Sequence, residues 1–212
     1  MIEADALLFD MDGLMVDSEP LWFEVERAFA RARGGDWTDD LADACVGKGL
    51  LNTLHVLGAR FHFPVEPVAM VDEIIDAFIL RASELRLKPG CAEILAAARG
   101  KVPMACASSS HSRLVHAALE RLSLTAFFDA IVTGDAVLHP KPAPDVFLLA
   151  AERLAALPAR CVVLEDSMAG VTAGVAAGMR VIAVPEHDPA AFAGKADVVV
   201  KDLFEARAHL GF

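Results

Sequence analysis

The chain has 212 residues, of which 55% are hydrophobic and 23% charged, so it can bury a sizeable core and is not intrinsically disordered. Its formal net charge of −11 argues against a general nucleic-acid or membrane-surface binder, and any phosphate site must be locally cationic. Because no apolar run reaches the ~18–20 residues of a membrane span and the acidic N-terminus lacks a signal-peptide pattern, we expect a cytoplasmic monomer without nucleic-acid or membrane partners.

The first predicted strand is the apolar run ALLFD, Ala6–Asp10, which leads directly into an acidic segment. Asp10, Asp12 and Asp17 follow one another within a few positions. Like charges at this spacing repel, so they must be solvated, neutralised or partly protonated. We therefore expect residues or ligands outside this segment to compensate its negative charge.

The segment from Ser18 to Leu87 has a different pattern, because its apolar residues recur at helical spacing and no strand pattern interrupts them. The turn LKPG, Leu87–Gly90, ends it. We therefore predict a helical insertion domain over residues 18–87. It is inserted into a discontinuous core domain of residues 1–17 and 88–212.

From Lys88 onward, short apolar runs alternate with helical stretches, which predicts a parallel sheet with helices on both faces. The predicted strands are Val102–Ser108, Ala130–Gly134, Cys161–Asp166, Arg180–Val184 and Asp197–Val200. The predicted helices lie near His111–Leu122, Pro144–Leu157 and Met168–Ala177. The expected fold class is thus α/β, with a Rossmann-like parallel core and an inserted all-helical domain.

The last of these predicted helices carries Gly170, Gly174 and Gly178 at intervals of four residues. This spacing places the glycines on one helix face. It predicts close packing of the helix on the sheet, with Gly178 as the C-terminal stop.

Polar residues gather where four predicted strands end, which is the edge of an open α/β sheet that binds ligands. Taken singly, each group could be a turn former, a helix cap or a solvated charge. Together, carboxylates, hydroxyls and one lysine suit phosphoryl transfer, in which acidic side chains hold a divalent cation, Mg²⁺ by preference. The groups are Asp10 and Asp12, the serines Ser108–Ser110, Lys141, and Glu165 with Asp166.

The stretches FDMDGLMVDSE, ASSS, KPAPDVF and LEDSMAGVTAG resemble the haloacid dehalogenase (HAD) superfamily. They are most similar to its branch of sugar-phosphate phosphatases and β-phosphoglucomutase-like enzymes with a helical cap. The first stretch, of the form DxDGxxxDSE, is very specific, whereas ASSS alone would be weak. The resemblance runs from Phe9 to Gly174 and implies a Mg²⁺-dependent enzyme that acts on a small phosphorylated metabolite.

The resemblance also implies a role for each core residue. Asp10 matches the nucleophile that becomes phosphorylated, and Asp12 matches the general acid and base, whose backbone carbonyl also binds the metal. Ser108 and Lys141 match the groups that hold the phosphate. Asp166 matches a metal carboxylate, and Glu165 is either a metal ligand or a partner of the ligands.

Four further residues are candidates for substrate binding. Ser109 lies in the serine loop of the core, and Glu19 lies where the chain enters the cap, where a hinge or capping role is the alternative. Lys48, in the segment VGKG, resembles a cap residue that reaches the substrate, or lies in a surface turn. Trp22 either stacks on a sugar or packs inside the cap.

Two departures from the mutase pattern favour hydrolysis. Trp22 stands where β-phosphoglucomutase-like enzymes have a histidine, and Leu50 replaces the arginine of their cap loop. We therefore expect a phosphatase that hydrolyses a small sugar or polyol phosphate monoester. A phosphosugar mutase and a non-catalytic phospho-ligand sensor are the alternatives, and a sensor would not need both Asp10 and Asp12.

Overall fold

A computed structural model of the chain describes residues 2–45 and 49–211. The chain divides into two compact units, which we name the core unit (residues 1–17 and 86–212) and the cap unit (residues 18–85). The predicted Lys48 and most of the predicted VGKG loop lie outside the described residues. Within the described ranges, no helix combines the length and the apolar character needed to cross a membrane.

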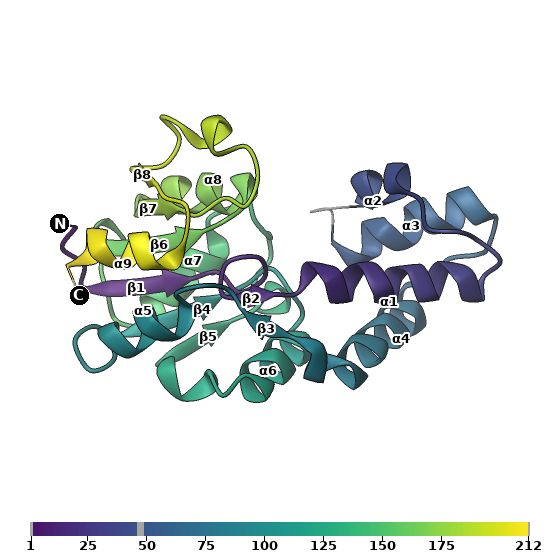
Figure 1. The fold of residues 1–212 in the computed structure, drawn as a ribbon, viewed down its shortest axis with the longest axis horizontal. Coiled ribbons are helices and arrows are strands. Elements are labelled where there is room, and N and C mark those ends of the chain that lie inside the picture. Colours follow the sequence, from purple (N-terminus) through teal and green to yellow (C-terminus); the bar gives the residue numbers. More distant parts are fainter. Residues whose placement is uncertain (1, 46–48, 212) are drawn as a thin grey trace. The chain divides into compact units, whose positions relative to one another are not determined.

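The core unit is built on a six-stranded sheet in which every pairing is parallel (Figure 1). The strand order is β5-β4-β1-β6-β7-β8. The chain leaves β1 for one side of the sheet and later returns to the other side at β6, so the topology switches beside β1. The strands are β1 (Ala6–Phe9), β4 (Met104–Ala107), β5 (Ala130–Val132), β6 (Cys161–Glu165), β7 (Arg180–Ala183) and β8 (Val198–Val199).

The three central strands are buried on both faces, as their continuous apolar sequences predict. Phe9 of β1 is in register with Cys106 of β4 and with Leu164 of β6. The residues that follow therefore leave the sheet at the same edge. This register is what brings the polar ends of these strands together.

Helices cover the sheet. Buried residues of α7 and α8, among them Phe147 and Val171, form one hydrophobic cluster with Leu8 and Val163 of the sheet. The predicted close packing of α8 is confirmed at Gly174, where a Cβ atom would lie 2.8 Å from Val181 Cγ2. The helices of the core unit are α5 (Cys91–Ala98), α6 (Ser112–Arg121), α7 (Asp145–Arg153), α8 (Met168–Ala176) and α9 (Leu203–Leu210). Short 3-10 turns are η2 (Thr125–Phe127), η3 (Gly134–Ala136), η4 (Pro158–Arg160) and η5 (Pro189–Phe192).

A second, two-stranded sheet in the core unit was not predicted from the sequence. β2 (Val16–Asp17) pairs antiparallel with β3 (Arg86–Leu87). A strand of two residues is too short to show an alternating pattern. Because β3 pairs with β2, the cap unit ends at Leu85 rather than at the predicted Leu87.

Helices joined by loops make up the cap unit, and its described residues include no strand. Leu21, Val25 and Phe29 form the buried face of α1, and Ile74 and Phe78 are buried on α4, which packs against it. These residues follow the helical spacing that predicted the cap. The helices are α1 (Glu19–Ala32), α2 (Asp39–Cys45), α3 (Leu50–Phe61), α4 (Pro67–Leu80) and the turn η1 (Ala82–Glu84).

Glu26, on α1, should make the free energy of unfolding depend on pH. Burial raises the pKa of the Glu26 carboxyl from 4.5 to about 7, and no described residue forms a hydrogen bond or ion pair with it. The folded protein therefore binds this proton more tightly than the unfolded chain. The stabilising effect of the neutral form is complete below pH 4.5 and is lost as the pH rises to about 7. We expect Glu26→Gln to raise the free energy of unfolding at pH 8 by about 1–3 kcal/mol.

The two tryptophans of the chain, Trp22 and Trp37, both lie in the cap unit, so their fluorescence during urea denaturation measures the effect. The gain from Glu26→Gln should be small at pH 5 and large at pH 8. Glu24→Gln is the matched control, because Glu24 lies on the same helix, is exposed and pairs with Arg27. An equal gain at both pH values would contradict titration of Glu26 as the cause.

Candidate active site

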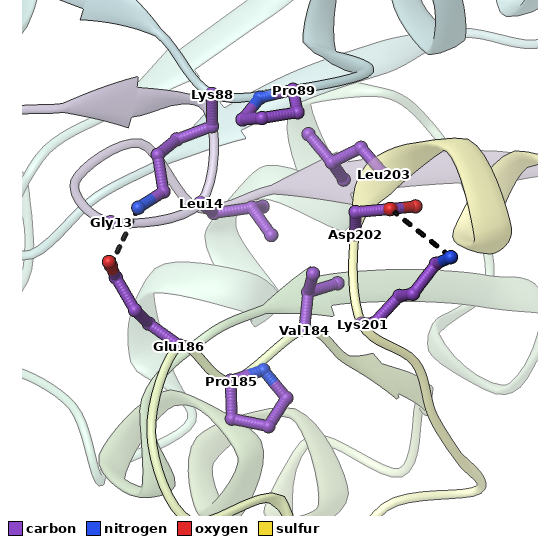
Figure 2. A pocket seen from close by; sticks show the side chains of 10 residues that line it. All are labelled: Gly13, Leu14, Lys88, Pro89, Val184, Pro185, Glu186, Lys201, Asp202 and Leu203. Atoms are coloured by element: carbon purple, nitrogen blue, oxygen red, sulfur yellow. Dashed lines mark hydrogen bonds and ion pairs between the residues drawn. The ribbon is translucent and has the colours of Figure 1, made fainter.

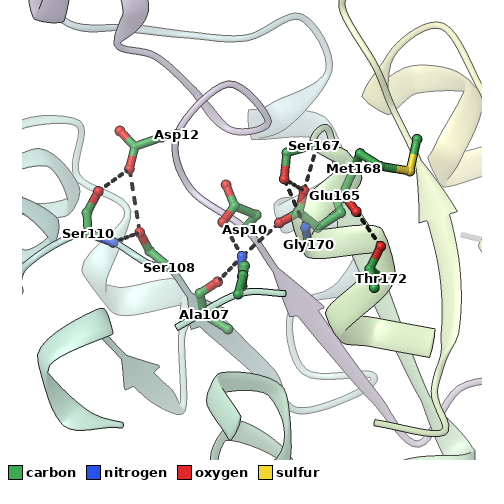
Figure 3. Close-up of polar contacts among 11 residues, drawn as sticks. Asp10, Asp12, Ala107, Ser108, Ser110, Glu165, Ser167, Met168, Gly170 and Thr172 are labelled. Carbon is green, nitrogen blue, oxygen red and sulfur yellow. Dashed lines mark hydrogen bonds and ion pairs between the residues drawn. The ribbon is translucent and has the colours of Figure 1, made fainter. Parts of the chain in front are cut away.

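The polar groups predicted at the strand ends meet at one edge of the core sheet (Figure 3). Asp10 follows β1, Ser108 follows β4, and Glu165 is the last residue of β6. Lys141 comes from the loop between η3 and α7, after β5. Asp10, Ser108 and Glu165 are all buried, so the site is part of the core rather than a solvated surface cluster.

Lys141 connects the ends of three strands. Its Nζ atom donates to Asp10 Oδ1 at 2.5 Å, to Glu165 Oε1 at 2.7 Å and to the carbonyl oxygen of Ala107 at 3.0 Å. Burial alone would lower the pKa of Lys141, but the neighbouring Asp10 and Glu165 carboxylates raise it above its usual range. The lysine is therefore a buried permanent cation beside Asp10.

One lysine does not neutralise the whole carboxylate cluster. Burial raises the pKa of Asp10 to about 8 and that of Asp166 to about 9, and repulsion from neighbouring carboxylates adds to both shifts. Carboxylate oxygens of Asp10, Glu165 and Asp166 lie within 4.8 Å of one another. A buried, all-oxygen donor set with excess negative charge suits a hard divalent cation.

Glu165 is held in place by its own surroundings. Its Oε2 atom accepts hydrogen bonds from the backbone N–H of Ser167 at 2.7 Å and from the Ser167 hydroxyl at 2.9 Å, while Oε1 accepts from Lys141. Both oxygens are thus engaged with the protein. This arrangement favours Glu165 as the residue that fixes Lys141, and leaves Asp10 and Asp166 as the carboxylates best suited to bind a cation directly.

Two glycines make room for the acidic side chains. A Cβ atom on Gly170 would lie 1.6 Å from Glu165 Oε1, so this glycine serves the site in addition to helix packing. Gly13 has φ +81, and a Cβ atom there would lie 2.3 Å from Asp166 Oδ2. Glycine adopts this positive φ without the steric cost that a Cβ atom would add. The sequence offered one indication of this role, because Gly170 lies in the first turn of the helix that comes shortly after Glu165.

Asp12 points toward the serine loop (Figure 3). Its Oδ2 atom accepts from Ser110 Oγ at 2.8 Å, and Ser108 Oγ lies at 3.5 Å from the same atom. Sequence reasoning placed Ser110 in the serine loop but missed its contact with Asp12. Ser109 is exposed, and its hydroxyl forms no hydrogen bond with the described parts of the chain.

Two of the candidate substrate-binding residues, Trp22 and Glu19, lie among the described residues of the cap unit. The ring of Trp22 packs on that of Phe78, with centroids 4.4 Å apart, as expected for a residue that packs inside the cap unit. Glu19 is exposed at the first position of α1. Their roles in substrate binding stay predictions.

The core unit also has a cavity of about 240 Å³, which Gly13 lines on one side (Figure 2). Lys88 Nζ lies 2.6 Å from Glu186 Oε2, and Lys201 Nζ lies 4.0 Å from Asp202 Oδ2. Each lysine of the cavity thus faces a carboxylate, so the cavity lacks the excess positive charge that a phosphate group needs. None of the predicted catalytic side chains lines it.

Comparison with known proteins shows the family to which the chain belongs. A family model described as haloacid dehalogenase-like hydrolase matches residues 7–184. The chain is 35% identical over 185 residues to the phosphorylated carbohydrates phosphatase of Thermotoga maritima, covering 82% of each chain. It is 32% identical over 178 residues to fructose-1-phosphate phosphatase YqaB of Escherichia coli, covering 84% of this chain and 95% of the relative. The crystal structure of a HAD family hydrolase from Deinococcus radiodurans with bound phosphate and sodium has a TM-score of 0.77 and 32% identity, covering 100% of this chain and 96% of that one. The chain therefore belongs to the haloacid dehalogenase-like hydrolase family.

Proposed function

We propose that this chain is a Mg²⁺-dependent phosphatase that hydrolyses a small sugar or polyol phosphate through an aspartyl phosphate on Asp10. The observation that carries the proposal is the buried contact of Lys141 with Asp10 Oδ1, at 2.5 Å. A cation fixed beside a nucleophilic carboxylate would stabilise the charge of a phosphoryl group that arrives there. The Thermotoga maritima and Escherichia coli relatives, described as phosphatases of phosphorylated carbohydrates and of fructose 1-phosphate, support the substrate class.

In the first step, a carboxylate oxygen of Asp10 attacks phosphorus while the bond from phosphorus to the alcohol oxygen breaks. Asp12 donates its proton to that oxygen, so the alcohol leaves neutral. Lys141 and Ser108 hold the oxygens of the phosphoryl group.

In the second step, Asp12 takes a proton from water as the water oxygen bonds to phosphorus. The bond from phosphorus to Asp10 breaks, inorganic phosphate leaves, and both carboxyl groups return to their starting states. The two roles of Asp12 require that its carboxyl can reach the alcohol oxygen and then the water.

The metal would be held by Asp10, Asp166 and the backbone carbonyl of Asp12, while Glu165 positions Lys141. When bound, Mg²⁺ would supply neutralisation of the phosphate charge and of the acidic cluster. The fit rests on the donor chemistry. Asp10 and Glu165 are buried and Asp166 is half-buried, all the donors are oxygen atoms, and the cluster carries more negative charge than Lys141 balances.

Hydrolysis is favoured over phosphosugar isomerisation by two residues of the cap unit. A mutase needs polar groups that hold the sugar in two orientations, and Trp22 and Leu50 stand where such groups occur in mutases. The packing of Trp22 on Phe78 supports this reading. We assign substrate contacts to Ser109, Glu19 and Lys48 as well, and the monomeric state and cytoplasmic location stay predictions.

The test is release of inorganic phosphate from p-nitrophenyl phosphate, fructose 1-phosphate and sorbitol 6-phosphate. We expect turnover with Mg²⁺, loss of turnover after exhaustive chelation and recovery on adding Mg²⁺. Ca²⁺ should inhibit, because its larger and more flexible coordination shell can engage both oxygens of Asp10. Full activity after chelation would contradict the metal role.

A second assay separates the phosphatase from the mutase. Conversion of β-glucose 1-phosphate to glucose 6-phosphate, faster than any release of phosphate, would establish the mutase instead.

A further inference from the structure

The hydroxyl of Ser110 makes a short contact with the carboxylate of Asp12. Ser110 Oγ lies 2.8 Å from Asp12 Oδ2, whereas Ser108 Oγ lies 3.5 Å from the same oxygen. The first distance is that of a good hydrogen bond to a carboxylate, and the second is at the limit of one. Of the two serines, Ser110 therefore fixes Asp12 more strongly.

The two serine hydroxyls share Asp12 Oδ2 as a partner, but only the Ser108 oxygen also accepts a backbone hydrogen bond. The backbone N–H of Ser110 donates to Ser108 Oγ at 3.0 Å, which fixes the position of the Ser108 oxygen. A serine hydroxyl carries only one proton. In the proposed function, the proton of Ser108 is needed for a phosphate oxygen, and that of Ser110 is committed to Asp12.

Backbone hydrogen bonds fix the serine loop to the end of β5 and to the segment that follows it. Ser108 N donates to the carbonyl of Val132 at 3.0 Å, and Gly134 N donates to the carbonyl of Ser110 at 2.9 Å. A Cβ atom on Gly134 would lie 2.1 Å from the carbonyl oxygen of Ser109, so the two segments are in close contact. Backbone hydrogen bonds at Ser108 and at Ser110 itself therefore fix the position from which the Ser110 side chain extends.

The loop is also fixed where it enters α6. Asp135 accepts hydrogen bonds from the backbone N–H of Ser112 at 3.0 Å and from the Ser112 hydroxyl at 2.6 Å. Asp135 lies in η3, next to Gly134. The same short segment therefore anchors residues on both sides of His111, and the position of Ser110 is set by the core unit itself.

We propose that Ser110 is a positioning residue that orients the carboxyl group of Asp12 for proton transfer, an inference that rests on the proposed phosphatase function. A carboxyl group held through Oδ2 presents its Oδ1 atom in a defined direction. Asp12 would pass its proton to the alcohol oxygen as the bond from phosphorus to that oxygen breaks. It would recover a proton from the water that then bonds to phosphorus.

The test uses two kinds of leaving group. An alcohol leaves readily only when it is protonated, whereas p-nitrophenolate leaves without a proton. The ratio kcat/KM covers the steps up to loss of the leaving group and therefore isolates the proton donation. For Ser110→Ala we expect a loss of about 10- to 100-fold in kcat/KM on fructose 1-phosphate or sorbitol 6-phosphate, and of less than about 3-fold on p-nitrophenyl phosphate.

Two further variants separate positioning from other roles. Ser110→Thr keeps the hydroxyl and should recover most of the lost activity on the alkyl ester. Thr172→Ala is the matched control, because it removes an exposed hydroxyl that donates to the carbonyl of Met168 on α8. It should change neither ester.

Each other outcome overturns the inference. Equal losses on both esters would show a general structural role, and a raised inhibition constant for inorganic phosphate would show that Ser110 binds the phosphate itself. If the unaltered protein hydrolyses neither ester, the proposed function has failed. If it hydrolyses both and Ser110→Ala matches it, only the positioning role has failed.

Discussion

Asp10→Asn is expected to abolish turnover while leaving the fold intact. The substitution keeps the volume of the side chain but removes the carboxylate oxygen that would attack phosphorus. We expect kcat to fall to less than about 1% of its original value, which corresponds to more than ~2.7 kcal/mol of lost transition-state stabilisation. The measurement is phosphate release from p-nitrophenyl phosphate and from the best sugar phosphate.

The variant should fold, because the cluster carries more negative charge than Lys141 neutralises. Burial and neighbouring carboxylates already raise the pKa of Asp10 to about 8, so a neutral side chain is tolerated there. Circular dichroism and the urea midpoint would verify this. Asp5→Asn is the matched control, because Asp5 is an exposed acidic residue that pairs with Arg160 near the start of β1. If Asp10→Asn keeps more than about 1% of kcat, Asp10 is not the nucleophile.

Lys141→Ala is expected to lower kcat by about 10²- to 10³-fold, whatever the leaving group. The lysine is a buried cation that touches both Asp10 and Glu165, so its loss removes charge stabilisation from the phosphoryl group. It also leaves the acidic side chains without their only lysine partner in the described cluster, and we expect a lower free energy of unfolding. Activity and urea denaturation, both with saturating Mg²⁺, measure the two effects.

Lys195→Ala is the matched control, because Lys195 is an exposed lysine of the same unit. It should alter neither activity nor stability. Lys48→Ala offers a second comparison, since a cap lysine should affect selected sugar phosphates and leave p-nitrophenyl phosphate unchanged. A larger loss for Lys48→Ala than for Lys141→Ala on both substrates would contradict the assignment of the core chemistry to Lys141.

The architecture of the core could be predicted because buried parallel strands have continuous apolar sequences. β1, β4 and β6 are such runs, and each is followed by the polar residues that the sheet edge then gathers. Because polar residues follow several of these predicted strands, the sequence was enough to predict that Asp10, Lys141 and Glu165 lie at the same edge of the sheet. Their burial and mutual contacts agree with that grouping.

The remaining features depend on contacts that no local pattern encodes. β2 and β3 are two-residue strands that exist because segments distant in sequence pair with each other. The link between Ser110 and Asp12 joins residues 98 positions apart, and only their spatial meeting distinguishes Ser110 from Ser108 and Ser109. The spacing of Gly170 from Gly174 predicted only helix packing. The structure shows that Gly170 also leaves space for the side chain of Glu165.

The most direct test of the account is to look for a phosphoryl group on Asp10 during turnover. The protein would be mixed with Mg²⁺ and excess p-nitrophenyl phosphate, quenched in acid within milliseconds, digested and analysed by mass spectrometry. We predict that the peptide containing Asp10 gains the mass of one phosphoryl group, and that Asp10→Asn shows no such gain. Steady release of phosphate with no phosphorylated peptide at any quench time, or with the phosphoryl group on another residue, would contradict the account.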